Sequence, residues 1–511
     1  MRKILLFSAA VTVLLIACQK NMNEETVAAN DQQQEQMTTQ QINDFIRQKV
    51  NETGSFNWRD ASDEMIWSAI HYSDRIISVG YKPLDESDID KRISSINIDD
   101  AKWRDVKQQL LELIFNEEKI KNPKLKIEDL EVWKENKLPV MDVKIESLKA
   151  IKLLRKNPLV RYVEPMGYDP LTYEKNNNIS DFSIFNGSGC DPYGGDTTLV
   201  AGVDYTVVSP NTKVSWNYRY HGIQKAWTKS TGAGVKIMVI DTGVSPDQDN
   251  LGSEFNQGLS SGRTLQKIFT LPNVTSADDG CGHGTTMSGE ASAPRGVDGN
   301  SCGVAYNCNL EVCRASKDVY IDESSEVKGV SDAYTTAGDD ASVKITSMSM
   351  GRITTSSQIT DAINYAYGKG KLMFCAGGTS FAWAAGFVGV VFPASLDNVE
   401  AITGVQDQST LKACSDCHKG KQIDFVIVME KSSTKVHPLS TAATGGDVPT
   451  TVGGSSVATS TAAGIAALVW SRFPSYTRED VVNKLTITAS SYPNKTANFG
   501  WGKLNADAAT N

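Results

Sequence analysis

The C-terminal half of the chain alternates short strand-like runs with helical patterns, and this alternation restricts its fold more than any other feature. A run rich in β-branched residues at 235–240 is typical of a parallel strand that is buried on both faces. Similar runs at 310–315, 343–350 and 372–376 predict further strands, and residues 357–367 carry apolar side chains at helical spacing. Alternating strands and helices predict an α/β domain with a mainly parallel sheet.

A charged, amphipathic region at 60–167 precedes this domain. Apolar residues recur at helical spacing in 103–121 and 145–156, and residues 159–163 alternate like a strand. We therefore expect a small α+β domain here. Residues 168–209, which are rich in Asn, Gly, Asp and Ser, predict a linker between the two folded parts.

The first eighteen residues have the pattern of a secretory signal peptide. Two basic residues precede an apolar stretch that is short for a membrane-spanning helix. The stretch ends in Leu-Ile-Ala-Cys, which is similar to a bacterial lipobox and implies a lipid on Cys18. That lipid would anchor the protein in the membrane of the bacterial cell envelope, at the outer membrane or cell surface; the alternative is a plain signal peptide. Polar residues at 19–59 then predict a flexible tether.

Composition excludes several classes of protein. Because 40% of the 511 residues are hydrophobic, the chain can build a sizeable core, and disorder of the whole chain is excluded. A formal net charge of −9 argues against a nucleic-acid binder, which needs a basic face. Nine cysteines leave eight after Cys18, an even number that suits disulfides outside the cytosol. Their pairing is left open.

Three short motifs bring an acid, a base and a hydroxyl into the α/β domain. Asp241 follows the run at 235–240, at the end of a strand where α/β proteins place their sites. His283 lies between two glycines, so we expect no backbone bulk to block its approach to a substrate. Ser456 begins a run of small residues that predicts a tightly packed helix, whose N-terminus offers free N–H groups. The order Asp, His, Ser suits nucleophilic catalysis.

With these motifs, residues 210–511 resemble the subtilisin-like serine peptidases, the S8 or subtilase family. The resemblance includes Ser-Met-Gly at 349–351, Pro-Ala-Ser at 393–395 and Gly-Trp-Gly-Lys-Leu-Asn-Ala at 500–506. It implies a three-layer α/β fold and a serine endopeptidase that cleaves polypeptides through an acyl-enzyme.

The resemblance also assigns roles to single residues. Asp241 would orient the general base His283, and Ser456 would be the nucleophile. The residues implied to bind substrate are Ser349, Met350, Gly351, Ala376 and Gly377. A peptide ligase would share the acyl-enzyme and is an alternative.

The region at 60–167 resembles the inhibitor I9-type propeptide of subtilases. The resemblance rests on the run Leu-Arg-Lys-Asn-Pro-Leu-Val-Arg-Tyr-Val-Glu-Pro at 154–165, with residues 77–81 as the opening strand. It implies a zymogen whose own propeptide is a binding partner of the catalytic domain. The alternative is an unrelated small α+β domain.

The nucleophile and oxyanion motifs depart from the family pattern. Ser455, Val457 and Ser460 stand where the family usually has Thr, Met and Pro. Gly378 stands where the family has the asparagine that binds the oxyanion, so a side-chain donor is missing there, and Thr379 is the nearest substitute. This gap supports an alternative function: a catalytically weak or inactive subtilase-fold protein that binds peptides.

Two further motifs raise the question of cofactors. Residues 414–418 (Cys-Ser-Asp-Cys-His) have the spacing of a c-type haem attachment site, but a local disulfide or a solvent loop is the favoured interpretation. Asp247 and Asp249 follow Asp241, and because subtilases often bind calcium, a structural calcium site is left open, with its ligands unknown. The proposed chemistry itself requires no cofactor.

Overall fold

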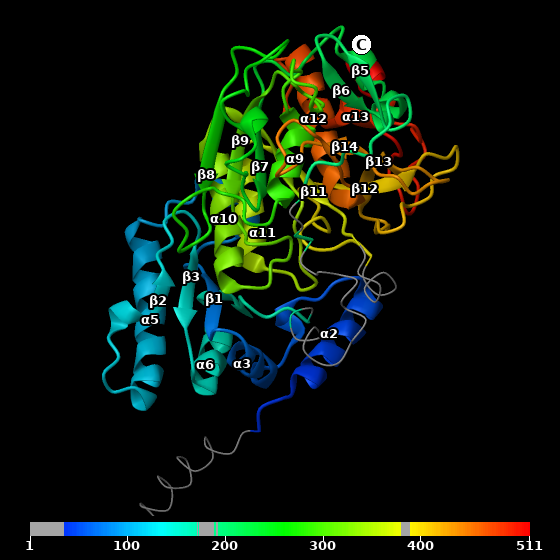
Figure 1. The fold of residues 1–511 in the computed structure, drawn as a ribbon. Helices are drawn as coiled ribbons and strands as arrows, with labels where there is room; N and C mark the ends of the chain where they lie inside the picture. The colour runs from blue at the N-terminus through cyan, green and yellow to red at the C-terminus, as the bar shows by residue number, and fades with distance from the viewer. Residues whose placement is uncertain (1–34, 171, 173–188, 191–192, 380–388) are drawn as a thin grey trace, which may run out of the picture. The chain divides into compact units, whose positions relative to one another are not determined.

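The centre of the C-terminal part is a seven-stranded, all-parallel sheet (Figure 1). The strand order is β13-β12-β11-β10-β7-β9-β8. In chain order the strands are β7 (Lys236–Asp241), β8 (Leu265–Phe269), β9 (Asn309–Arg314), β10 (Val343–Met348), β11 (Leu372–Ala376), β12 (Glu400–Gln406) and β13 (Ile423–Glu430). The predicted α/β class with a mainly parallel sheet is confirmed.

The computed structural model describes residues 35–170, 172, 189–190, 193–379 and 389–511. The expected signal peptide and Cys18 lie outside these residues. All contacts discussed below are within residues 39–511, which form one compact unit. None of the helices in the described ranges is long and apolar enough to cross a membrane.

Helices cover both faces of the parallel sheet, and the residues of β7 show how. Ile237 and Val239 point into a core shared with α9 (His283–Ser292) and α12 (Gly454–Arg472). Met238 and Ile240 point into a second core, which α10 (Ser324–Asp339) and α11 (Ser357–Gly368) complete. Because successive side chains of a strand face opposite sides, a strand apolar on both faces requires these two helical layers.

A second, antiparallel sheet of order β2-β3-β1-β4 lies in the N-terminal part. Its strands are β1 (Ile76–Tyr81), β2 (Glu131–Trp133), β3 (Val140–Lys144) and β4 (Val160–Pro165). It is accompanied by α3 (Asp63–Tyr72), α4 (Ile89–Arg92), α5 (Ala101–Lys121) and α6 (Leu148–Lys156). Residues of this part, such as Val140 and Tyr162, share the second core with α10 and α11. Those two helices therefore lie between the two sheets.

The remaining elements are short or peripheral. Two hairpins are β5 (Tyr205–Val208) with β6 (Thr212–Ser215), and β14 (Leu439–Ser440) with β15 (Thr450–Thr451). The other α-helices are α8 (Ile223–Ala226), α13 (Arg478–Thr488) and α14 (Ala506–Ala509). Helix α13 begins with a capping box, with Thr477 as N-cap and Asp480 as its partner.

Two expected boundaries differ from the structure. The tether expected over 19–59 contains α2 (Thr39–Thr53), whose Ile42, Ile46 and Val50 are buried at helical spacing. The linker expected over 168–209 contains β5, which pairs with β6. Polar composition concealed α2, which buries few apolar side chains, and β5 is short and has no fully buried side chain.

Candidate active site

Asp241 and His283 meet at the carboxyl end of the parallel sheet. Asp241 is the last residue of β7 and His283 the first of α9, and the imidazole Nδ1 lies 2.7 Å from Asp241 Oδ1. Both side chains are buried, and the same carboxylate oxygen accepts from Thr242 N at 2.9 Å. Because a carboxylate only accepts, the hydrogen of this bond lies on Nδ1. The other ring nitrogen, Nε2, is left to act as a base.

Asp279 and two glycines bring α9 to β7. The Asp279 carboxylate accepts from the N–H groups of Gly282 and Thr285 at 2.7 and 2.9 Å, which caps the helix. A Cβ on Gly284 would lie 2.3 Å from the carbonyl oxygen of Gly243, so the close approach requires glycine. Gly284 therefore serves the packing of helix on strand, and not the access of substrate that the sequence suggested.

The pKa of His283 reflects two opposing influences. Burial lowers it, but the charge and hydrogen bond of Asp241 act in the other direction, and the net result is a raised pKa. Asp279 adds to this increase. Asp241 therefore stabilises the imidazolium that forms when His283 takes up a proton.

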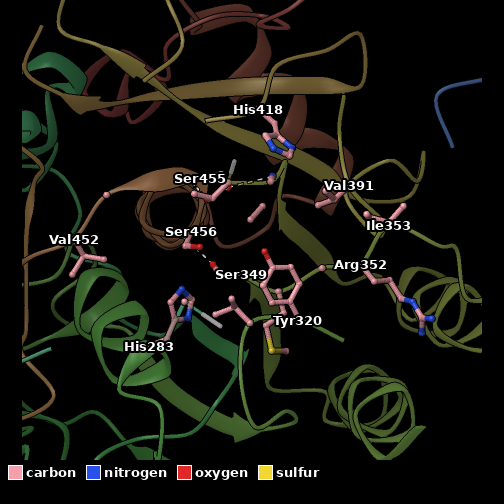
Figure 2. A pocket seen from close by; sticks show the side chains of 18 of the residues that line it. His283, Tyr320, Ser349, Arg352, Ile353, Val391, His418, Val452, Ser455 and Ser456 are labelled. Carbon is pink, nitrogen blue, oxygen red and sulfur yellow. Dashed lines mark hydrogen bonds between the residues drawn. The ribbon is translucent and has the colours of Figure 1, made fainter. Parts of the chain in front are cut away.

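Ser456 lies in the first turn of α12, where backbone N–H groups have no acceptor within the helix. Its carbonyl oxygen accepts from Ser349 Oγ at 3.0 Å, which ties this turn to the end of β10. Ser456 and His283 line one pocket, as Figure 2 shows. The three residues predicted from the motifs are thus brought to one site, with Asp241 behind His283.

Four of the five residues expected to bind substrate line the same pocket: Ser349, Met350, Gly351 and Ala376. The strand expected over 343–350 ends at Met348, and beyond it the Gly351 N–H donates to Val319 O at 3.1 Å. Gly377 differs from the expectation. Its N–H donates to Ile402 O at 2.8 Å, and a Cβ there would meet Ile423. Gly377 therefore faces the sheet.

The expected oxyanion residues, Gly378 and Thr379, also line the pocket. Gly378 N donates to Ser455 Oγ at 3.2 Å, and the Thr379 hydroxyl lies 3.1 Å from the same oxygen. Ser455 N also donates to Thr379 Oγ1, at 3.4 Å. The hydroxyl of Thr379 is thus already engaged by Ser455.

Two disulfides lie within the described part of the chain. Cys414 and Cys417 are bonded to each other, so the favoured local disulfide is confirmed and their thiols are not available to a haem. Cys190 is bonded to Cys281, two residues before His283. The other four cysteines in the described ranges are buried free thiols: Cys302, Cys308, Cys313 and Cys375. The even number of cysteines therefore suggested more disulfides than the described residues contain.

Sequence reasoning missed several residues of the site. Asp279 had a signal, since an acid shortly before a helix start is a capping pattern. Gly189, Tyr193 and His418 line the pocket from distant parts of the chain, and only His418 belonged to a motif that drew attention.

The described residues give no support for the calcium site that was left open near Asp247 and Asp249. In the ranges that the structure describes, no three or more His, Cys, Asp or Glu side chains form a group that could hold a metal ion. The calcium site thus stays a prediction, and no step of the chemistry is derived through it.

Comparison with known proteins places the chain in a family. The model of the subtilase family matches residues 232–502. Subtilisin from Bacillus sp. (strain TA39) is 28% identical over 299 residues, which cover 56% of this chain and 68% of that protein. Subtilisin Savinase from Lederbergia lenta is 30% identical over 280 residues, which cover 55% of this chain and 92% of that protein. The solved structure of Sphericase, 26% identical, gives a TM-score of 0.44 and covers 56% of this chain and 97% of that chain. The chain therefore belongs to the subtilase family of subtilisin-like serine endopeptidases.

Proposed function

We propose that this protein is a secreted, lipid-anchored serine endopeptidase that is made as a zymogen and cleaves polypeptides through Asp241, His283 and Ser456. The observation that carries the proposal is the 2.7 Å bond between Asp241 and His283 in a pocket that Ser456 also lines. The alternative of a weak or inactive peptide-binding protein rests on Gly378, which has no side chain to donate to an oxyanion.

The reaction follows from the roles of the three side chains. Ser456 Oγ attacks the carbonyl carbon while its proton passes to His283 Nε2, and the π electrons of the carbonyl move onto its oxygen. When these electrons return, the C–N bond breaks and His283 gives the proton to the leaving amine. Water then attacks the acyl-enzyme by the same route and releases the acid. Asp241 keeps the imidazole oriented throughout.

Labelling with a serine-directed phosphonate tests the catalytic assignment. We expect the label on Ser456, and we expect Ser456→Ala to abolish both labelling and peptide hydrolysis. Ser460→Ala is a matched control, because Ser460 lies one turn further along α12 and is buried. Retained hydrolysis in Ser456→Ala, or a label on another residue, would refute the assignment. Labelling without hydrolysis would favour the binding protein.

Contacts of the N-terminal part with the catalytic part support the zymogen. Arg161 pairs with the buried Asp361 through two bonds of 2.7 and 2.8 Å. The Glu164 carboxylate accepts from Ser357 N at 2.7 Å, at the N-terminus of α11. These contacts hold β4 against the helix that precedes β11 and fit a propeptide that docks on its own enzyme.

The end of the proposed propeptide is held beside the pocket. The guanidinium of Arg352, a lining residue, donates to the carbonyl oxygens of Met166 and Tyr168 at 3.0 and 2.8 Å. Asp169 accepts from Ile353 N at 2.9 Å. These contacts tie the chain that follows β4 to residues 352 and 353, which also line the pocket, and they support the proposal that it is cut there.

Self-processing has a test that also locates the cut. We expect cleavage between Met166 and Val214, and its loss in Ser456→Ala purified alone. Because Cys190 is bonded to Cys281, a cut before Cys190 releases the N-terminal fragment without reductant. A cut after Cys190 keeps the fragment attached until a reductant is added. Gels with and without reductant separate these cases, and normal processing of Ser456→Ala would exclude self-cleavage.

The lipid anchor rests on the sequence around Cys18. Metabolic labelling with radioactive palmitate in a bacterial host should mark the wild type and leave Cys18→Ala unmarked. Absence of label from both proteins would leave a plain signal peptide as the explanation, and equal labelling of both would refute Cys18 as the lipidated residue.

A further inference from the structure

The oxyanion side of the site lacks the donor that the proposed reaction needs. Attack by Ser456 places a negative charge on the former carbonyl oxygen, which fixed donors must stabilise. The N–H of Ser456, in the first turn of α12, can supply one hydrogen bond. Gly378 has no side chain, and the Thr379 hydroxyl is engaged with Ser455. A second side-chain donor must therefore come from elsewhere.

The ring of His418 occupies the space that a side chain at position 378 would take. A Cβ built on Gly378 would lie 2.4 Å from His418 Nδ1. The backbone fixes this placement: His418 N donates to Gly378 O at 3.0 Å, and Thr403 Oγ1 donates to His418 O at 2.5 Å. The Cys414–Cys417 disulfide closes the turn immediately before the ring.

The ring of His418 is buried, and the described residues leave its nitrogens without a hydrogen bond of normal geometry. Its residue is 5% exposed. Within the described part of the chain the backbone of Gly389 acts on the ring, but neither ring nitrogen meets a partner at hydrogen-bond geometry. Buried polar groups are nearly always hydrogen-bonded, and an exception points to a ligand or a catalytic role. His418 lines the same pocket as Ser456, and in Figure 2 it lies on the side of Ser456 opposite to His283.

The protonation state suits a neutral donor. Burial lowers the pKa of His418 to about 4, an effect that the backbone of Gly389 only partly offsets. At neutral pH the ring therefore carries one N–H and no charge, and it donates without competing with His283 for the proton of Ser456.

We propose that the His418 imidazole is a catalytic residue that donates the second hydrogen bond to the oxyanion, in place of a side chain at position 378. The inference rests on the proposed function. No proton is transferred: the N–H of His418 shortens its bond to the oxygen as the carbonyl electrons move onto it, and relaxes when they return. With this donor in place, the glycine at position 378 no longer argues for a catalytically weak or inactive protein.

Kinetics of His418→Phe and His418→Gln test the proposal. Phenylalanine keeps the ring shape without a donor, and glutamine restores an N–H. We expect His418→Phe to lower kcat by about 10²–10³ with KM little changed, the range for loss of one oxyanion donor. We expect His418→Gln to recover at least tenfold of that loss. Tyr476→Phe, which removes a hydroxyl from a ring stacked on Phe473 outside this pocket, should stay within threefold of wild type.

A peptide aldehyde, which forms an oxyanion on binding, gives a second readout. His418→Phe should raise the inhibition constant of the aldehyde by the same factor by which it lowers kcat. The dissociation constant of the cleaved peptide product should not change. Wild-type kcat in His418→Phe, or a comparable loss in Tyr476→Phe, would overturn the proposal. If His418→Phe weakened the binding of the aldehyde and of the product equally, His418 would have a structural role only. These outcomes need an active wild type, so an inactive wild type refutes the proposed function and is distinguishable from them.

Discussion

Two buried histidines line the same pocket, and their environments are opposite. His283 is paired through Nδ1 with Asp241, and its pKa is raised despite burial. Among the described residues no carboxylate acts on the ring of His418, and burial lowers its pKa to about 4. The comparison teaches that burial alone makes a histidine a neutral donor, whereas burial with an ion-pair partner makes it a base that can hold a proton.

Removal of the carboxylate should have the largest effect on this comparison. We expect Asp241→Asn to lower kcat by about 10⁴, since asparagine cannot stabilise the imidazolium and favours the wrong tautomer of His283. Active-site titration followed by steady-state kinetics on a peptide substrate measures this. Turnover near the wild-type value would remove Asp241 from the catalytic group.

The approach of α9 to β7 should be the next most sensitive feature. The Cβ of Gly284→Ala would lie 2.3 Å from Gly243 O, which is backbone and cannot move away easily. We expect kcat to fall by about 10², because a shift of His283 of about 1 Å is enough for such a loss. Gly280→Ala is the control, since its added Cβ meets nothing within 4 Å. Equal kinetics of the two variants would contradict the packing argument.

On the other side of the pocket, a side chain at position 378 should displace His418. We expect Gly378→Ala to lower kcat by about tenfold, because its Cβ would collide with the ring. The φ of +119° at Gly378 adds backbone strain, so Gly262→Ala, with φ +69° and open space around its Cβ, is the control. A rise in kcat for Gly378→Ala would show that the ring obstructs the reaction.

The pH dependence of activity should distinguish the two histidines, and it is the prediction with the smallest expected change in rate. The proposed reaction requires neutral His283, so activity should fall as the pH drops through the raised pKa of this residue. His418, with a pKa of about 4, is still neutral over that range. We therefore expect His418→Gln to leave the acid limb of kcat/KM unchanged while lowering its plateau. If His418→Gln shifted the pH of the acid limb, the titrating group would be His418 and not His283.

Most elements of the parallel sheet could be predicted because their period is visible in one segment. The run at 235–240 became β7 (Lys236–Asp241), and the pattern at 357–367 became α11 (Ser357–Gly368). Helix α10 was not predicted because several of its buried residues, such as Glu326, Lys328 and Ser331, are polar, so its buried positions do not form an apolar pattern. A Cβ on Gly329 of this helix would lie 2.2 Å from Ala315 O. This glycine therefore allows close packing, although in the sequence a glycine argues against a helix.

The sequence by itself determined the α/β class and the identities of Asp241, His283 and Ser456, because strand period and residue chemistry are local properties. Only the tertiary structure decided that Asp279 caps α9, that Thr379 is engaged with Ser455, and that His418 lies over Gly378. The last contact exists because β11 and β12 are neighbouring parallel strands, so the segments that follow them meet at one edge of the sheet. A distance between residues 378 and 418 is a property of that pairing, and no pattern in either segment encodes it.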